Sequence, residues 1–320
     1  MKAITHDRYG NADVLRVEEL PIPEIGDDEV LIRVHAAGVD RGVWHLMTGT
    51  PTMVRPFIGL RGPRQRTIGM DVAGVIDKVG SNVTQLAVGD RVFGVATGSF
   101  AEFAKAKPRQ LARMPEALTF EQAAALPVSG LTALQALRAV APVNGKRLMI
   151  IGAGSGVGTF AVQLAKAQGA HVTAVCSPGK ADLVRELGAD EVVDYTVHDL
   201  GLGTHDIIFD IAGIRAVRAL RERLAPRGTV VFIGGEGGGQ FMNGMQRQIV
   251  PSLTAPLTRT RFVTLAATTN TADLEELARL FDAGSVAPVV HQTFPLEGAA
   301  EALHYIGEGH ATGKTVITVR

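Results

Sequence analysis

The spacing of hydrophobic and polar positions changes near residue 120 of this chain. Before that point, short stretches alternate between apolar and polar residues, which predicts strands over residues 30–36, 72–79, 91–95 and 100–104 with turns between them. After it, apolar runs of strand length alternate with segments of helical periodicity. We therefore expect an irregular β domain followed by a domain of alternating strands and helices.

The second part begins with helical patterns over residues 121–125 and 132–139, and a buried strand then starts at Leu148. The later strands are expected over residues 171–176, 191–194, 206–210, 229–233, 262–267 and 315–319. The later helices are expected over residues 181–187, 216–223, 272–284 and 298–307. Because apolar strands linked by helices form parallel sheets with both faces covered, this pattern predicts an α/β fold with a doubly wound parallel sheet.

A glycine-rich turn separates the strand that starts at Leu148 from the next helix. Glycines at such a turn let the backbone approach a pyrophosphate, whose charge the N–H groups and dipole of the helix stabilise. Thr159 stands where G-x-G-x-x-G has its third glycine, so the prediction depends on the strand–turn–helix context. A purely structural turn is the alternative. The residues expected to bind a dinucleotide are Gly154, Ser155, Gly156, Val157 and Gly158.

The end of the strand over residues 171–176 favours NADP over NAD. An acidic residue about 20 positions after the glycines would accept a hydrogen bond from the ribose 2′-hydroxyl. The chain instead has Ser177 there, with Lys180 three residues later. A hydroxyl donor and a cation suit a 2′-phosphate. Alternatively, Lys180 is a solvated residue at the start of a helix, where Asp182 offsets part of its charge.

Composition narrows the class of protein further. A chain of 320 residues, 46% hydrophobic and without net charge, is long enough for two domains. The balanced charge argues against a nucleic-acid partner, and the chain has no apolar run of the roughly 18 residues that a membrane span needs. One cysteine, Cys176, excludes internal disulfides, and the N-terminus has no signal-peptide pattern. We therefore expect a cytoplasmic protein.

The chain resembles the zinc-independent members of the medium-chain dehydrogenase/reductase superfamily, near the quinone oxidoreductases and alkene reductases. The resemblance covers nearly the whole length and rests on blocks in the family's order, namely residues 1–3 with 9–10, 36–39, 69–75, 88–92, 98–102, the glycine turn and 313–314. It implies a GroES-like irregular β-barrel catalytic domain over residues 1–120, a Rossmann domain over 121–262, and a return to the catalytic domain over 263–320.

The positions that hold catalytic zinc in zinc-dependent relatives carry other residues in this chain. Asp40 and Met70 stand where those relatives have a cysteine and a histidine. A carboxylate and a thioether do not make a tetrahedral site of nitrogen and sulfur ligands, and the single cysteine lies elsewhere in the sequence. We therefore expect no metal in this protein.

The resemblance also implies residues near the nicotinamide. Asp40 replaces an asparagine that bonds the nicotinamide ribose, and a carboxylate can accept from ribose hydroxyls but cannot donate. His45 replaces a tyrosine, and its imidazole can relay a proton after hydride transfer, or it is a satisfied surface histidine beside Trp44. Asp71 is expected to be a buried carboxylate satisfied by backbone donors. The residues expected to line an apolar substrate pocket, or alternatively to belong to the core, are Trp44, Met47, Met53 and Phe57.

Further cofactor contacts follow from the family's pattern and from the rule that α/β sheets bind ligands at the carboxyl ends of their strands. Thr132 is expected near the cofactor phosphates and Tyr195 beside the 2′-phosphate. Lys314 matches a Gly-Lys block near the cofactor, although a solvated lysine fits equally well. The expected contacts at strand ends are Ala212, Gly213, Gly234 and Gly235, of which Gly213 and Gly234 also fit plain turns.

Together these features predict an enzyme that transfers hydride from NADPH to a quinone or to an activated C=C bond of the enone type, without a metal. Its partner would be a small, apolar, electron-poor molecule. Two alternatives stay open: a reductase of ketones or enoyl thioesters in a biosynthetic pathway, and a non-catalytic redox sensor that binds NADPH. Because relatives commonly pair through edge strands of the Rossmann sheet, we expect a homodimer formed through residues 262–267.

Overall fold

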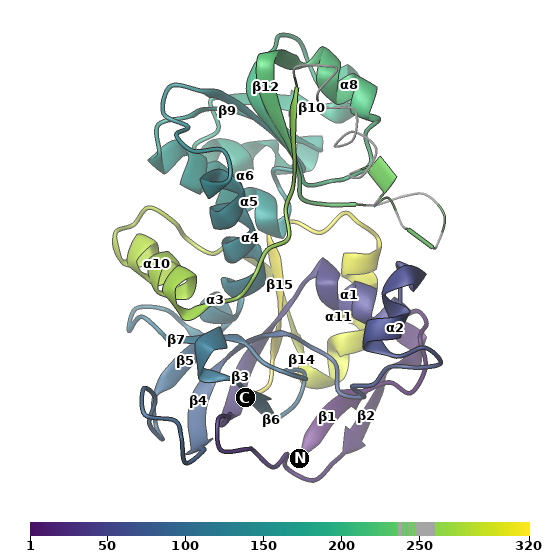
Figure 1. Cartoon of the computed structure of the whole chain (residues 1–320), viewed down its shortest axis with the longest axis vertical. Helices are drawn as coiled ribbons and strands as arrows, with labels where there is room; N and C mark the ends of the chain where they lie inside the picture. Colours follow the sequence, from purple (N-terminus) through teal and green to yellow (C-terminus); the bar gives the residue numbers. More distant parts are fainter. Residues whose placement is uncertain (236–238, 240, 243, 245, 248–259) are drawn as a thin grey trace. The chain divides into compact units, whose positions relative to one another are not determined.

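The computed structural model describes residues 1–235, 239, 241–242, 244, 246–247 and 260–320 (Figure 1). The chain forms two compact units, of which the first comprises Met1–Leu131 with Thr268–Arg320 and the second Thr132–Ala267. The first boundary lies later than residue 120, because helix α3 (Phe120–Ala124) packs on strands of the first unit. The second lies later than residue 262, because strand β13 (Arg261–Thr264) pairs within the sheet of the second unit.

The second unit contains a six-stranded parallel sheet in the order β10-β9-β8-β11-β12-β13. Its other strands are β8 (Arg147–Ile151), β9 (His171–Cys176), β10 (Glu191–Asp194), β11 (His205–Asp210) and β12 (Leu224–Phe232). Its helices include α5 (Gly156–Ala167), α6 (Ala181–Glu186), α7 (Tyr195–His198) and α8 (Val217–Glu222). When these six strands are numbered by their order along the chain, their order across the sheet is 3-2-1-4-5-6. This is the order of a dinucleotide-binding sheet, so the predicted doubly wound fold is confirmed.

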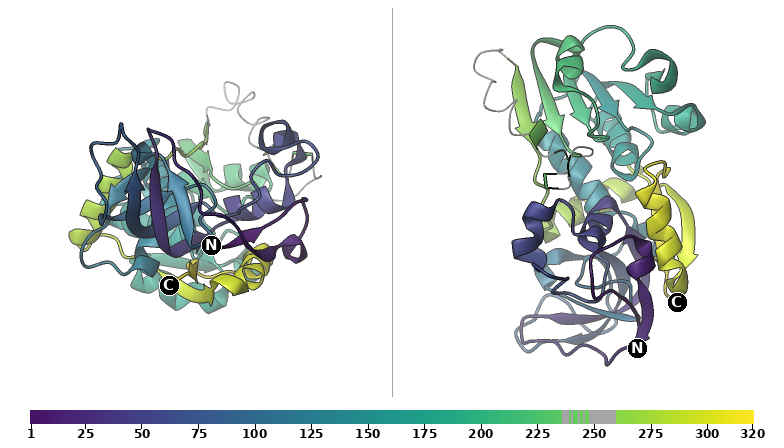
Figure 2. Two further views of the ribbon diagram at one scale, coloured as in Figure 1. Left: turned by 90° about the horizontal axis from the view of Figure 1, so that it is seen from below. Right: turned by 90° about the vertical axis from the view of Figure 1, so that its right-hand side faces the viewer.

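The first unit contains a seven-stranded sheet in the order β14-β15-β3-β4-β5-β7, with β6 paired to β3, and a separate hairpin of β1 and β2. Its strands are β1 (Lys2–Thr5), β2 (Arg16–Glu19), β3 (Val30–Val39), β4 (Asp71–Val79), β5 (Arg91–Val95), β6 (Phe103–Ala106), β7 (Leu111–Arg113), β14 (Val290–Pro295) and β15 (Lys314–Thr318). All its pairs are antiparallel except β14 with β15. Both chain ends lie in this unit (Figure 2).

Helices α1 (Arg41–Thr48), α2 (Arg55–Ile58), α10 (Thr271–Asp282) and α11 (Ala299–Gly307) complete the first unit, and α4 (Pro127–Arg138) contributes residues to both units. The core between α1, α11 and the sheet includes Met47, Phe100 and Leu303. No helix within the described residues is both long and apolar enough to cross a membrane.

Three differences from the expected elements have physical causes. The sequence pattern did not predict strands β2 and β14, because their residues are mostly exposed and neither strand has an apolar face. The strand expected over residues 100–104 corresponds to β6, which begins only at Phe103. Phe100 is fully buried before it, where its N–H donates to the carbonyl of Ile68 and its carbonyl accepts the N–H of Ile4. Helix α1 was not predicted because it spans only eight residues, too few for its apolar face to repeat over several turns.

Candidate functional site

The glycine turn follows β8 at the carboxyl edge of the parallel sheet. Ser155 caps α5: its Oγ accepts the N–H of Gly158 at 3.2 Å and donates to the Gly152 carbonyl at 2.7 Å. A Cβ on Gly158 would lie 2.2 Å from that same carbonyl oxygen, so only glycine fits. The N–H groups of Gly156 and Val157, at the first positions of α5, have no acceptor within the helix and suit an anion.

The turn lies where the strand order of the sheet reverses, between the neighbouring strands β8 and β11. The N–H of Ala212, just after β11, donates to Ile151 at the end of β8 at 3.2 Å. Gly213 has a φ of +67°, and a Cβ on it would lie 2.7 Å from the backbone of Gly234. The structure thus brings the glycine turn, Ala212, Gly213 and Gly234 to one edge, and Gly213 has a structural reason for its identity as well.

Sequence reasoning missed a buried ion pair at this edge. Asp210, the last residue of β11, is fully buried; its Oδ1 accepts the N–H of Gly213 at 3.0 Å and its Oδ2 lies 2.9 Å from Arg247. Arg247 also donates to the carbonyls of Gly213 and Arg215. Burial raises the pKa of the Asp210 carboxyl, and the charge of Arg247 opposes this rise. The sequence did contain one signal for this pair, an aspartate at the end of an apolar strand.

The residues expected at a 2′-phosphate lie at the next strand ends. Cys176 of β9 pairs with Asp194 of β10, so Ser177 and Tyr195 leave the sheet side by side. A Cβ on Gly154 would lie 2.6 Å from Cδ of Lys180, so the lysine stem packs against the glycine turn. Burial lowers the pKa of the Lys180 ammonium. A fully solvated Lys180 is therefore wrong, although the helix α6 does begin directly after it.

Asp40 begins helix α1 in the first unit. Its Oδ1 accepts the N–H of Val43 at 3.2 Å, as a helix cap does. The residue is only 8% exposed, and its Oδ2 is buried without a hydrogen-bond partner among the residues that the structure describes. A buried acceptor without a donor is unfavourable, so this oxygen suits a donor such as a ligand hydroxyl.

Lys314 is buried and forms an ion pair, so the solvated-lysine alternative is wrong. Its Nζ lies 3.1 Å from Oδ2 of Asp71, whose Oδ1 accepts the N–H of Val128 at 3.0 Å. The predicted backbone donor to Asp71 is confirmed, whereas its ammonium partner was not foreseen. Burial raises the pKa of Asp71 to about 7, and the nearby charge of Asp40 adds to the rise, while Lys314 and Val128 oppose it.

The expected catalytic and pocket residues occupy different surroundings. His45 lies in the last turn of α1, half-buried, with its ring edge-on to Trp44 at 5.3 Å between centroids. Met47 is 1% exposed and belongs to the core, so of its two expected roles the core is confirmed and the pocket wall is wrong. Phe57, on α2, is 79% exposed, while Trp44 and Met53 are partly buried. Thr132 is partly buried in α4.

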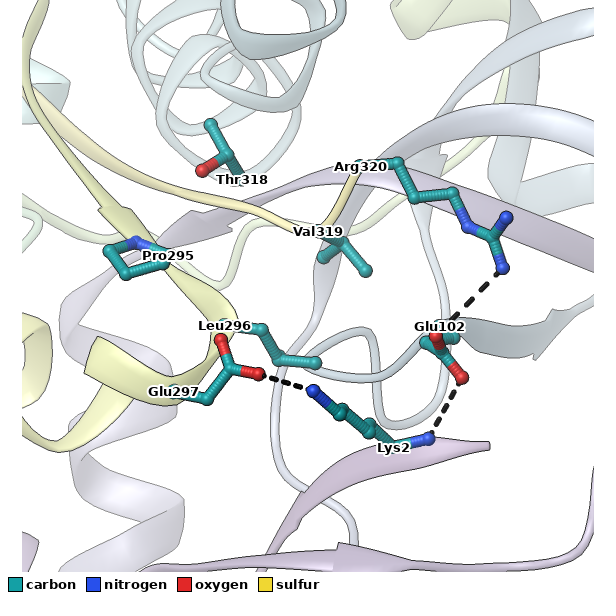
Figure 3. Close-up of a pocket in the computed structure, with 8 residues that line it drawn as sticks. All are labelled: Lys2, Glu102, Pro295, Leu296, Glu297, Thr318, Val319 and Arg320. Atoms are coloured by element: carbon teal, nitrogen blue, oxygen red, sulfur yellow. Dashed lines mark hydrogen bonds and ion pairs between the residues drawn. The ribbon is translucent and has the colours of Figure 1, made fainter.

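A hollow of about 220 Å³ in the first unit is lined by Lys2, Glu102, Pro295, Leu296, Glu297, Thr318, Val319 and Arg320 (Figure 3). Its lysine is already paired, with Nζ 2.9 Å from Glu297, and it includes none of the expected site residues. Across the described residues, no three His, Cys, Asp or Glu side chains gather in a way that could hold a metal ion. The glycine turn and the strand ends around it are therefore the candidate site of the second unit, and Asp40 and His45 that of the first.

Comparisons with known proteins match both units. Residues 26–116 match the model of the alcohol dehydrogenase GroES-like domain, and residues 187–317 match that of zinc-binding dehydrogenase. The mitochondrial NAD(P)H oxidoreductase RTN4IP1 of Mus musculus is 35% identical over 100% of this chain and 89% of its own. The chloroplastic NADPH-dependent alkenal/one oxidoreductase of Arabidopsis thaliana is 34% identical over 99% of this chain and 79% of its own. The solved quinone oxidoreductase from Coxiella burnetii is 28% identical, with a TM-score of 0.88 over 100% of this chain and 99% of that one.

Proposed function

This chain belongs to the medium-chain dehydrogenase/reductase superfamily, and we propose that it is an NADPH-dependent reductase that transfers hydride to a quinone or to an electron-poor C=C bond. The proposal rests chiefly on the glycine turn at the reversal point of the sheet, with Ser177, Lys180 and Tyr195 at the adjacent strand ends. These residues fit the cofactor because the turn admits no Cβ at Gly158 and leaves helix N–H groups for a pyrophosphate.

NADPH, when bound, supplies the hydride for the reduction. The residues of the chain have separate tasks. The N–H groups of Gly156 and Val157 bind the pyrophosphate, and Ser177, Lys180 and Tyr195 bind the 2′-phosphate. The buried Oδ2 of Asp40 accepts a hydrogen bond from a ribose hydroxyl, which gives this oxygen its donor. His45 holds the proton that the reduced substrate takes up at its oxygen or carbon.

The proposal includes neither a metal nor a membrane anchor. A homodimer through β13 also stays a prediction; that strand lies at an edge of the second unit's sheet, where such pairing is possible. A cytoplasmic location likewise stays a prediction. The oxidoreductase activity itself is common to the relatives named above, whereas the substrate class is our inference.

The first expected result is that the purified protein oxidises NADPH in the presence of a quinone or an enone and uses NADH less well. Loss of nicotinamide absorbance measures the rate, and cofactor fluorescence measures binding separately. A panel that includes ketones and enoyl thioesters distinguishes the substrate classes. Tight NADPH binding without oxidation of any substrate would favour a redox sensor instead, and no binding would contradict the dinucleotide site.

Replacing His45 with glutamine is expected to lower kcat by about a hundredfold, the usual contribution of a general acid. Binding of NADPH should stay unchanged, because the substitution leaves the turn after β8 intact. The matched control is His304→Gln, which removes a histidine whose side chain is 75% exposed on α11. An unchanged kcat in His45→Gln would mean that water delivers the proton.

A further inference from the structure

Arg215 reaches from the end of β11 to the end of β10. Its Nη1 lies 2.7 Å from Oδ1 of Asp199, and its guanidinium carbon lies 5.8 Å from the ring centroid of Tyr195. Its backbone carbonyl accepts a hydrogen bond from Arg247, which ties the backbone at Arg215 to the buried Asp210. The guanidinium therefore lies beside Tyr195, the residue that directly follows β10.

The ion pair with Asp199 uses only part of what Arg215 can bind. A guanidinium carries five N–H donors, and Nε of Arg215 is buried without a hydrogen-bond partner among the described residues. The side chain of Asp199 is 57% exposed, so water can replace the guanidinium around this carboxylate at small cost. The pair is therefore one that a stronger anion can open.

The other acids near these strand ends are engaged elsewhere. Asp194 accepts hydrogen bonds from the backbone N–H and the hydroxyl of Thr196, at 2.8 and 2.7 Å. Asp182 pairs with Arg185 at 2.8 Å. Asp199 is thus the carboxylate that competes directly for Arg215.

We propose that Arg215 binds the 2′-phosphate of NADPH and that Asp199 is its intramolecular competitor, an inference that rests on the proposed function. A phosphate monoester carries a charge of about −1.5 to −2 at neutral pH, whereas a carboxylate carries a single negative charge. The phosphate oxygens also match the fork of N–H donors on the guanidinium. On binding, the phosphate takes the place of Asp199 beside Arg215, and Asp199 turns to water. Arg215 thereby adds a second cation to Lys180 and strengthens the preference for NADPH over NADH.

The two partners of the pair give opposite predictions. In Arg215→Gln, the dissociation constants of NADPH and of 2′,5′-ADP should rise about tenfold to a hundredfold, while that of NADH stays the same. In Asp199→Asn, binding of NADPH and 2′,5′-ADP should tighten by a few-fold, because the competitor is gone. The matched control is Arg218→Gln, which removes a 91% exposed arginine that pairs with Glu222 on α8.

Isothermal titration with NADPH, NADH, 2′,5′-ADP and 5′-AMP measures these constants without turnover. Equal weakening of NADPH and NADH in Arg215→Gln would overturn the inference, as would an unchanged preference. Weaker NADPH binding in Asp199→Asn would show that the pair is structural, and would overturn it too. This second variant decides the matter even if Arg215→Gln fails to fold. If the wild-type protein bound no dinucleotide at all, the proposed function would fail instead.

Discussion

Replacing Lys314 with methionine is expected to lower the free energy of unfolding by about 3–5 kcal/mol at about pH 8, because the buried Asp71 carboxyl then either stays ionised without its counter-ion or must take up a proton. Urea unfolding measures the effect. The chain has a single tryptophan, Trp44, in the first unit that contains this pair, so its fluorescence follows the relevant transition.

The free energy of unfolding that Lys314→Met loses relative to the wild type should grow as the pH rises. In the folded protein the pKa of Asp71 is raised from 3.8 to about 7, so the folded state holds this proton more tightly than the unfolded chain. Stability from this group is therefore present at low pH and is lost as the pH rises through about 7. Without Lys314 the folded pKa rises further. The variant should thus differ least from the wild type at about pH 5 and most at about pH 8.

The matched control for this prediction is Lys2→Met. Lys2 also pairs with a carboxylate of the first unit, Glu297 at 2.9 Å, but both side chains are about half exposed, so its removal should change stability little. The double variant Asp71→Asn/Lys314→Met should recover part of the loss, because no buried charge remains while the asparagine oxygen can still accept from Val128. A Lys314→Met protein as stable as the wild type at about pH 8 would contradict the importance of the pair.

Replacing Gly158 with alanine is expected to weaken NADPH binding by at least about a hundredfold. The added Cβ would lie 2.2 Å from the backbone oxygen of Gly152 and 2.5 Å from that of Ala153. Because these are backbone atoms, the helix must move away from the turn, and its N–H groups then leave the pyrophosphate. The same overpacking should lower stability by about 1–3 kcal/mol.

The control for Gly158→Ala is Gly179→Ala, where an added Cβ meets nothing within 4 Å. It should bind NADPH as the wild type does. Cofactor fluorescence measures affinity, and circular dichroism shows whether each variant is folded. If Gly158→Ala bound NADPH normally, the pyrophosphate would have to lie elsewhere.

The strands of the second unit were predicted from the sequence better than those of the first. In the second unit, the central strands β8, β9 and β11 are buried on both faces, so each appears as a short apolar run. The strands β9 and β10 have the expected bounds. In the first unit, strands such as β2 and β14 are short and mostly exposed. Strand β15 pairs with β3, which lies far away in the chain. Pairing between distant segments leaves no local period in the sequence.

Helix α4 illustrates the same limit. The pattern placed its start at residue 132, but the helix begins at Pro127, where the carboxylate of Asp71 accepts the N–H of Val128. A carboxylate stabilises a helix N-terminus, yet this one comes from strand β4, 57 residues earlier in the chain. A cap supplied by tertiary contact cannot be read from the residues next to the helix.

The sequence by itself determined the strand–turn–helix unit, the glycine turn and the residues at the strand ends, because short-range backbone geometry dictates glycine and serine there. Only the tertiary structure decided that Lys314 is the counter-ion of Asp71, that Met47 belongs to the core, and that Arg215 lies beside Tyr195. The physical reason is that burial and ion pairing depend on which distant segments meet, whereas turns and helix caps depend mainly on neighbours along the chain.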